Sequence, residues 1–544
     1  MVNNISNMIN TQLRFTGMAS GLDTDYIIQQ MMSIERLKVD RVKQDKQILE
    51  WKRDDYRSIT NLLRGFMDEF FDILKPATNM RSSSTYYAYK VKSSNENIAT
   101  AVTKGQVAML EHTIEVTRLA EKAKMEAEKG KFGGVGLSLN STIADIADVY
   151  DIDLTYDSSL GKNKLSLKVN GETIEITEDK KFSDLISAIN NSDAGVKISY
   201  SSFLDQFFME SKDTGAVAEI DVTDDEETIT ADFFSALGFD VSQVVTGQDA
   251  EFVLDGQEAT RNSNIFTIDG VTYTLTGTGE ATITLTQDTD AIFNRIKNFI
   301  DKYNELIEKI SGKVNEERPK SGGRYGSYYL PLTEDQKKAM TEDEIKKWEE
   351  QAKKGLLRND SLLSNIVQRM RSVMGDVTEA GGLFSIGIST GNWREGAKLF
   401  IDEDKLRKAI EDNPDRVMEI FAKSSEISYS PDNTKELRDQ RYKESGVIER
   451  LFDVLQDNIR TSRDKDGKKG FLLEKAGIVG DITEFKNTLV EQINDKELLI
   501  EDMTIKLYEK EESLYIKFAA LEAALSRMNS QSAWLAQSFG GGRQ

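Results

Sequence analysis

Hydrophobic residues near the start of the chain recur at the spacing of an α-helix. Asp23, Thr24 and Asp25 offer capping oxygens ahead of this run. The run begins at helical spacing and continues as a seven-residue repeat, through Ile27, Ile28, Met31, Met32 and Ile34 and then Val42, Leu49, Tyr56, Leu63 and Phe70. The pattern predicts a long helix that ends at Pro76. Because such a rod has no core of its own, we expect it to pack in a bundle or a coiled coil.

A second seven-residue repeat occupies the C-terminal region and holds one register over seven positions, Ile493, Ile500, Leu507, Leu514, Leu521, Met528 and Leu535. A second apolar position is filled only late, by Phe518 and Leu525. Glu497, Thr504 and Glu511 occupy that position earlier in the repeat. A strict repeat of this kind predicts a left-handed supercoil. Because the earlier part has a single apolar seam, we expect its face to be shared with a partner chain.

Between the two ends, from about residue 82 to residue 287, short alternating runs predict β-strands. Asn170-Gly171 and Asp269-Gly270 each separate two such runs, which is the typical signal of a two-residue hairpin. A further strand is expected over 281–285 and a short helix over 182–189. This texture predicts one or two antiparallel β-rich modules rather than an alternating βαβ fold.

Helical spacing returns after the strands, in a stripe formed by Ile292, Ile296, Phe299, Tyr303, Leu306 and Ile310. A charged stretch over 333–354, a hairpin around 383–401 and a helix over 403–411 are expected further along. Because helices flank the β-rich region on both sides, we expect that region to be inserted into a helical domain. The predicted fold class is α+β, with terminal coiled-coil helices and a helical-bundle domain carrying inserted antiparallel β-rich domains.

Composition narrows the range of partners. The 544 residues include 70 Lys and Arg against 92 Asp and Glu, a formal net charge of −22. Neutralising phosphates requires an excess of basic residues, so we expect no nucleic-acid partner. Residues 1–11 do not form a Sec signal peptide, and no stretch reaches the ~18–20 apolar residues of a membrane span. The chain has no cysteine, which excludes disulfides and thiolate metal sites and suits export in an unfolded state.

The sequence offers little for catalysis. His112 is the only histidine, and it lies in a strand-like run where we expect a surface or half-buried residue rather than a base or a ligand. No P-loop, dinucleotide fingerprint or nucleophile elbow is present. Asp464, Asp466 and Gly467 resemble a calcium loop only superficially, because the glycine falls two positions early. We therefore predict a protein that is not an enzyme, with no catalytic residue, no cofactor and no metal site.

The most distinctive segments lie at the two ends. Residues 15–25 read FTGMASGLDTD, and residues 518–530 read FAALEAALSRMNS, followed by Trp534 and Leu535. Both segments resemble the flagellar filament-capping protein family, FliD or hook-associated protein 2. Residues 292–306 resemble the bundle helix of that family, and residues 331–357 resemble an insertion found in some of its members. Residues 383–404 are similar to its hairpin and the helix that follows.

The resemblance implies a fold of coiled-coil legs, a helical bundle and β-rich plate domains. It also implies a structural cap at the distal end of the bacterial flagellar filament, an oligomeric ring that promotes flagellin folding and insertion. Such a protein is secreted through the flagellar type III channel to the extracellular filament tip. The implied partners are further copies of the chain, flagellin, the hook–filament junction proteins and a cytoplasmic export chaperone on the C-terminal helix.

On this basis we expect four parts. Residues 1–40 and 501–544 form the coiled-coil leg region, and residues 41–76 and 288–500 form the helical-bundle domain with its β-hairpin. Residues 77–125 and 241–287 form a β-rich domain, into which a second β-rich domain of residues 126–240 is inserted. The expected oligomer or partner interface comprises Ile27, Met31, Ile34, Ile500, Leu507, Leu514, Phe518, Leu521, Leu525, Met528 and Leu535. The expected bundle core comprises Val42, Leu49, Tyr56, Leu63, Phe70, Ile296, Phe299 and Tyr303.

Two other functions fit the same pattern. One is a cell-surface adhesin that binds host glycan or matrix through its β-rich domains. The other is a different axial flagellar subunit, such as flagellin or a junction protein. Residues 17–21, which read GMASG, and the insertion near Trp348 favour the cap. An enzyme is the least favoured reading.

Overall fold

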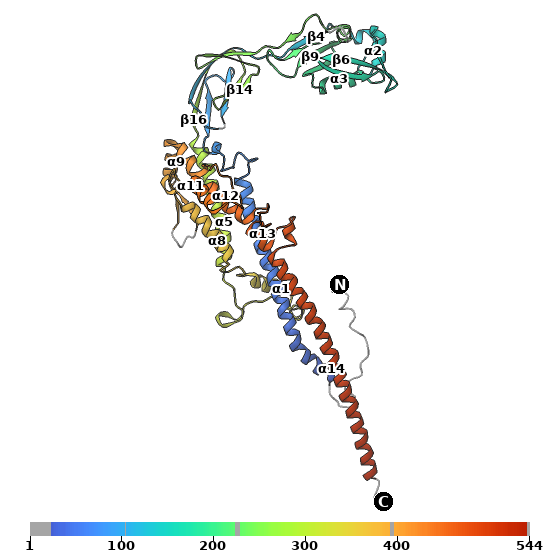
Figure 1. Ribbon diagram of the computed structural model, residues 1–544, viewed down its shortest axis with the longest axis vertical. Helices are drawn as coiled ribbons and strands as arrows, with labels where there is room; N and C mark the ends of the chain where they lie inside the picture. Colours follow the sequence, from blue (N-terminus) through green and yellow to red (C-terminus); the bar gives the residue numbers. More distant parts are fainter. Residues whose placement is uncertain (1–22, 104, 224–228, 392–396, 541–544) are drawn as a thin grey trace. The chain divides into compact units, whose positions relative to one another are not determined.

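The computed structural model describes residues 23–103, 105–223, 229–391 and 397–540. The chain forms two compact units, a helical unit of residues 1–82 and 293–544 and a β-rich unit of residues 83–292 (Figure 1). In the sequence, the β-rich unit therefore interrupts the helical one. The predicted α+β class is confirmed. Of the segment that begins at Phe15, residues 15–22 lie outside the described residues.

The helical unit contains two long helices, several short ones and a small hairpin. Its helices are α1 (Thr24–Phe70), α5 (Thr289–Asn315, which begins in the β-rich unit), α6 (Glu334–Lys338), α7 (Glu342–Lys353), α8 (Ser361–Gly375), α9 (Glu403–Asp412), α10 (Pro414–Ala422), α11 (Lys435–Glu444), α12 (Val447–Ile459), α13 (Phe471–Ala476) and α14 (Thr488–Gly540). Its 3-10 turns are η5 (Gly323–Tyr325), η6 (Leu383–Ile386) and η7 (Ile482–Glu484). The predicted hairpin is confirmed, since β17 (Ile388–Thr390) pairs antiparallel with β18 (Leu399–Ile401).

Helix α1 begins where the capping signal predicts, because the Asp23 carboxylate accepts the backbone N–H of Tyr26 at 2.9 Å. It ends at Phe70, and the prediction that it continues to Pro76 is wrong. The reason is a return of the chain onto the end of the helix. The Thr78 hydroxyl donates to the carbonyl of Glu69 at 2.6 Å, and the Met80 N–H donates to the carbonyl of Phe70 at 2.8 Å. These bonds satisfy carbonyls that a longer helix would have used.

The bundle core lies where the second half of α1 meets α5. The Phe299 ring lies 5.6 Å from the Phe66 ring and 5.4 Å from the Phe70 ring, as measured between centroids. Six of the expected core residues are fully buried, namely Tyr56, Leu63, Phe70, Ile296, Phe299 and Tyr303. Val42 and Leu49 are only half-buried, on a stretch of α1 beside the segment that precedes α6. There, the Gln44 amide donates to the carbonyl of Pro331 at 2.6 Å.

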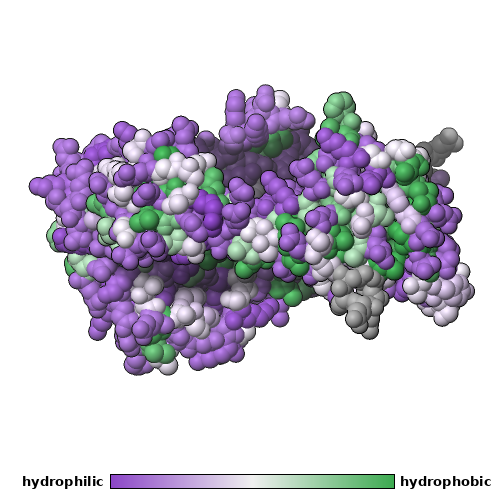
Figure 2. Space-filling model, turned by 90° about the horizontal axis from the view of Figure 1, so that it is seen from above, coloured by the Kyte–Doolittle hydropathy of each residue, from purple (hydrophilic) through white to green (hydrophobic). Residues whose placement is uncertain are grey.

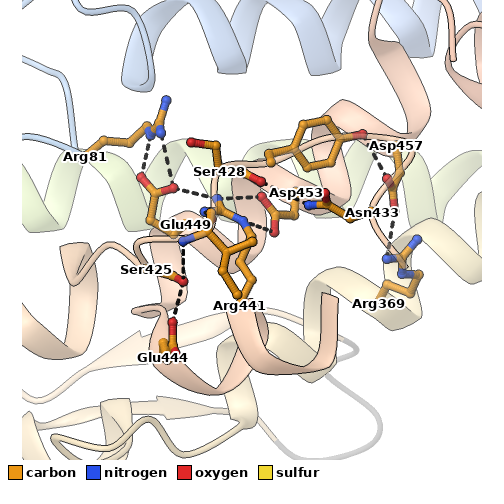
Figure 3. Close-up of polar contacts among 12 residues, drawn as sticks. Arg81, Arg369, Ser425, Ser428, Asn433, Arg441, Glu444, Glu449, Asp453 and Asp457 are labelled. Atoms are coloured by element: carbon orange, nitrogen blue, oxygen red, sulfur yellow. Dashed lines mark hydrogen bonds and ion pairs between the residues drawn. The ribbon is translucent and has the colours of Figure 1, made fainter. Parts of the chain in front are cut away.

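A buried network of charges joins α11 and α12 to the segment that follows α1 (Figure 3). The Glu449 carboxylate, only 2% exposed, accepts two bonds from Arg81 and one from Arg441 at 2.8 Å. Arg441 also forms two bonds of 2.8 Å with Asp453. The Arg81 guanidinium lies 4.1 Å from the centre of the Phe452 ring. These contacts connect parts of the helical unit that are far apart in the sequence.

The β-rich unit contains two hydrophobic cores. The first lies between a five-stranded sheet, in the order β1-β16-β3-β12-β13, and a three-stranded sheet, in the order β14-β15-β2. The strands are β1 (Tyr89–Ser93), β2 (Ala99–Thr103), β3 (Glu111–Arg118), β12 (Ala250–Leu254), β13 (Gln257–Arg261), β14 (Ile265–Ile268), β15 (Val271–Leu275) and β16 (Gly279–Gln287). Every pairing is antiparallel, as predicted.

The second core is formed by residues between 123 and 239. Two three-stranded sheets, β4-β9-β8 and β5-β6-β7, contribute to it together with three helices. The strands are β4 (Lys124–Glu126), β5 (Thr155–Asp157), β6 (Lys162–Val169), β7 (Glu172–Thr177), β8 (Val196–Ser201) and β9 (Gln206–Ser211), with a small pair β10 (Glu219–Ile220) and β11 (Val245–Thr246). The helices are α2 (Ile143–Tyr150), α3 (Phe182–Asn191) and α4 (Thr230–Ala236); the 3-10 turns of the unit are η3 (Ser83–Thr85) and η4 (Gly133–Val135).

Both predicted two-residue hairpins are confirmed. Asn170 and Gly171 connect β6 to β7 with positive φ angles of 49° and 79°, and Asp269 and Gly270 connect β14 to β15 with 49° and 83°. Positive φ at both positions matches the right-handed twist of the paired strands. A third turn of this type, Asp255-Gly256 between β12 and β13, was not predicted.

His112 is buried in β3, with 4% of its surface exposed, so the expectation of a surface or half-buried position is wrong. The alternation of β3 turns His112 to the same face as Ile114 and Val116, toward the first core. Its Nδ1 lies 2.7 Å from the Asp255 carboxylate, which also accepts the N–H of Thr113. His112 therefore holds the β12–β13 turn against β3.

Candidate assembly interface

Helices α1 and α14 pack side by side along much of their length (Figure 1). Lys510 lies 2.8 Å from Glu35, and Lys496 lies 3.1 Å from Asp45, measured between ammonium nitrogen and carboxylate oxygen. Higher numbers on α14 thus face lower numbers on α1, so the pair is antiparallel. The two helices come from opposite ends of the sequence, and they present a common surface.

The polar positions of the C-terminal repeat lie beside α1 of the same chain. Glu497 is 3.4 Å from Lys46, and Glu511 is 3.9 Å from Arg36. The Thr504 hydroxyl instead donates to the carbonyl of Ile500 one turn earlier. We predicted that the polar part of the seam would be shared with a partner chain, and the structure places two of its three residues in intramolecular ion pairs.

Glu35 carries the clearest electrostatic signature of this pair of helices. Hydrogen bonds from the ammonium groups of Lys38 and Lys510 lower the pKa of the Glu35 carboxyl to about 2, although desolvation opposes them. Lys38 lies one turn along α1, whereas Lys510 belongs to α14. Part of the shift therefore depends on the pairing of the two helices. Because the Glu35 side chain remains partly open to solvent, its contribution to stability is screened.

Burial of the apolar seam on α14 decreases towards the C-terminus. Ile493 is buried, and Ile500, Leu507 and Leu514 are half-buried. Leu521 is 45% exposed, Met528 is 61% exposed and Leu535 is 46% exposed. The ion pair of Glu35 with Lys510 shows where α1 lies along α14, and so why burial of the seam decreases. The described part of α1 begins eleven residues before Glu35, so its start lies near position 521 of α14.

The remaining predicted interface residues are divided between half-buried and exposed positions. Ile27, Phe518 and Leu525 are half-buried, whereas Met31 and Ile34 are exposed. Sequence reasoning missed further large apolar residues that are exposed on the same two helices, namely Tyr26, Leu37, Leu498, Leu499, Ile505, Tyr508, Ile516 and Trp534. Leu498 and Ile505 are also seven residues apart, so a search for a second register could have found them.

This surface is suited to binding another helix. The apolar residues of the seven-residue repeat share one register on α14, and ion pairs between α14 and α1 lie beside them. Burying one Leu or Met side chain from full exposure contributes about 1.5–3 kcal/mol. On the face seen in Figure 2, hydrophilic residues cover most of the surface and hydrophobic residues form smaller patches among them. The exposed end of α14 is therefore a candidate for a helix–helix contact.

The suspected calcium loop is explained by local bonding. One Asp464 oxygen accepts the N–H groups of Asp466 and Lys468, and the other pairs with Arg460 at 3.0 Å. The carboxylate thus closes its own turn. Across the ranges that the structure describes, no group of His, Cys, Asp and Glu side chains is arranged to hold a metal ion. In the same ranges, no helix is both long and apolar enough to span a membrane.

Comparison with known proteins places matches at both ends of the chain. Residues 20–123 match the family described as flagellar hook-associated protein 2 N-terminus, and residues 247–530 match flagellar hook-associated protein 2 C-terminus. A relative from Halalkalibacterium halodurans, named flagellar hook-associated protein 2, is 29% identical over 97% of this chain and 100% of its own length. A protein of the same name from Thermotoga maritima is 30% identical over 75% of this chain and 58% of its own length.

Among solved structures, the chain is similar to the D1-D2-D3 domains of the flagellar cap protein FliD from Escherichia coli. The sequence identity is 21%, the TM-score is 0.49, and the match covers 74% of this chain and 96% of that one.

Proposed function

The chain belongs to the flagellar hook-associated protein 2 family, and from this membership we propose that it is a structural cap at the distal end of the bacterial flagellar filament. In this role several copies form a ring that promotes the folding and insertion of arriving flagellin subunits. The protein reaches the extracellular tip through the flagellar type III export channel.

The observation that carries the proposal is the family match over residues 247–530, which includes the bundle helices and most of α14. The match at the other end includes α1, the helix that packs against α14. The matched segments thus include all of α1 and the part of α14 up to residue 530, with Leu521 and Met528 of the exposed seam. The chain acts by binding, and we assign it no catalytic residue and no cofactor.

We propose that the exposed residues Leu521, Met528 and Leu535 contact other molecules in two successive situations. In the cytoplasm they bind an export chaperone, which covers the apolar seam before export. At the tip they pack against helices of neighbouring copies or of flagellin. When the first ring assembles, the chain contacts the hook–filament junction proteins. We also propose that the chain has four parts, a leg region, a helical-bundle domain and two β-rich domains. Their boundaries along the chain fall after residues 40, 76, 125, 240, 287 and 500.

The proposal is tested by deleting the gene and complementing the deletion. Deletion should give short or absent filaments and flagellin monomers in the medium, and the wild-type gene should restore swimming. A triple variant with Leu521→Glu, Met528→Glu and Leu535→Glu should not restore it, because charges cannot be buried in an apolar helix contact.

The matched control for the triple variant carries the same added charge on the same helix. Ser526→Glu, Gln531→Glu and Gln537→Glu alter exposed polar positions and should restore swimming. Normal filaments after gene deletion would refute the cap. A deletion strain that swims but no longer attaches to host cells would instead favour the adhesin alternative, which the matched relatives do not support.

A further inference from the structure

A small pocket with several arginines lies in the helical unit, between α8, residues 429–433, α11 and α12. Its volume is about 170 Å³. Four arginines line it, Arg369, Arg438, Arg441 and Arg450, together with two aspartates, Asp453 and Asp457. The hydroxyl-bearing residues Ser372 and Ser430 line it as well. Neither the family match nor the proposed capping function assigns a role to this pocket.

Arg450 is the least compensated of these arginines. It is 2% exposed, and its Nε has no hydrogen-bond partner. Its two terminal nitrogens make long bonds of 3.4 Å to the carbonyls of Val377 and Lys443. Its guanidinium carbon lies 4.3 Å from the centre of the Tyr442 ring. A buried charge normally requires a counter-charge, and among the described residues Arg450 forms no ion pair with a carboxylate.

The nearby carboxylates are engaged by other groups. Asp453 binds Arg441 twice at 2.8 Å, and Asp457 binds Arg369 at 3.0 Å and the Tyr429 hydroxyl at 3.0 Å (Figure 3). Each aspartate is therefore matched by one arginine, and Arg438 and Arg450 remain.

Two further carboxylates act on Arg450 from outside the pocket lining. Asp376 accepts the Tyr442 hydroxyl at 2.6 Å, and Glu379 pairs with Lys423 at 2.6 Å. Desolvation lowers the pKa of Arg450, and it outweighs the opposing effects of Tyr442 and of these two carboxylates. Arg438 is exposed, and it donates to the backbone carbonyls of Pro431 and Asn433 rather than to a carboxylate. The pocket thus combines a buried cation with an exposed one.

We propose that this pocket binds a small inorganic oxyanion, phosphate or sulfate, which Arg450 and Arg438 contact. The volume of about 170 Å³ is well above the minimum that a single water molecule needs, and it accommodates a tetrahedral oxyanion. A guanidinium binds such an anion through two parallel N–H···O bonds, and this geometry makes arginine the preferred residue for phosphate. Because the lining comes from three helices, a bound anion would stabilise their packing in the helical unit.

The experiment measures phosphate binding to the full-length chain. Isothermal titration calorimetry with inorganic phosphate, and the melting temperature in phosphate against chloride at constant ionic strength, give two readouts. We expect saturable binding and a higher melting temperature in phosphate, because a ligand that binds only the folded state stabilises it. Sulfate should compete with phosphate for the site.

Two variants test the residues that we assign. Arg450→Met keeps much of the side-chain volume and removes the charge, and it should weaken phosphate binding about tenfold or more. Arg438→Gln removes the charge of an exposed residue, and it should weaken binding in the same direction. Arg463→Gln is the matched control, since Arg463 is also exposed and does not line the pocket.

The phosphate-binding measurements on the wild type and the three variants decide for or against the site. Binding that is lost in Arg438→Gln and Arg450→Met but kept in Arg463→Gln supports the site. Absence of saturable phosphate binding in the wild-type chain would overturn the proposal, and so would equal binding by all three variants. These outcomes do not depend on swimming, so the oxyanion site and the capping function can fail separately.

Discussion

Replacing Glu449 by glutamine tests the buried charge network of the helical unit. Glu449→Gln keeps the shape of the side chain and removes its negative charge. The carboxylate accepts two bonds from Arg81 and one from Arg441, whereas the amide keeps only one acceptor oxygen and offers no negative charge to either guanidinium. The Gln amide also places an N–H₂ group where an acceptor is needed.

The expected loss of stability follows from burial. Breaking a buried ion pair by removing one partner costs about 3–5 kcal/mol. Arg441 keeps both of its bonds to Asp453, and Arg81 keeps its contact with the Phe452 ring. The lower end of the range therefore applies, and we expect Glu449→Gln to reduce the free energy of unfolding of the helical unit by about 3 kcal/mol.

The assay is urea unfolding followed by circular dichroism at the helical band, because the long helices belong to the helical unit. Glu308→Gln is the control. Glu308 pairs with Lys398 at 2.9 Å, but its side chain is 68% exposed, so its loss should cost less than about 1 kcal/mol. If Glu449→Gln were no more destabilising than Glu308→Gln, the reasoning from burial would be refuted.

Three further predictions concern other parts of the helical unit. Met528→Glu should leave the melting temperature of the monomer unchanged and weaken self-association in sedimentation velocity, since Met528 is exposed in the single chain; an unchanged sedimentation profile would contradict the assigned interface. Gly477→Ala should destabilise the unit by more than about 1 kcal/mol in the same urea assay, because φ is 67° and an added Cβ would meet the carbonyl oxygen of Thr483. The contribution of Glu35, whose pKa is lowered to about 2, should be fully present above pH 4.5 and disappear as the pH falls through 2. Hydrogen exchange of α14 in the wild type and in Glu35→Gln should therefore differ at neutral pH and converge near pH 2, and a difference that persisted there would argue against the Glu35 contact with Lys510.

Local sequence signals predicted several elements correctly. The carboxylate of Asp23 caps α1, and the pairs at 170–171 and 269–270 form hairpin turns with positive φ. These elements depend on residues within a few positions of one another, so a single sequence carries enough information to place them. Two more local signals of this kind lie in the sequence. Thr333 and Thr341 form capping boxes with Gln336 and Glu344 at the starts of α6 and α7, within the stretch described only as charged.

The seven-residue repeats determined the existence of α1 and α14 and the apolar face of each. They could not determine which face of α14 is covered by α1, because a repeat gives a register but not the position of the partner helix. The ion pairs at Lys496 and Lys510 decide this position, and with it the exposure of Leu521, Met528 and Leu535.

By itself, then, the sequence determined the α+β class, the insertion of the β-rich unit and the membership of a flagellar family, since all three depend on local patterns and on segments of characteristic composition. Only the tertiary structure decided that His112, Glu449 and Arg450 are buried. Charged residues are normally placed on the surface when only the sequence is known. His112 and Glu449 are buried against Asp255 and Arg81, which lie more than a hundred residues away along the chain, and periodicity carries no information about such contacts.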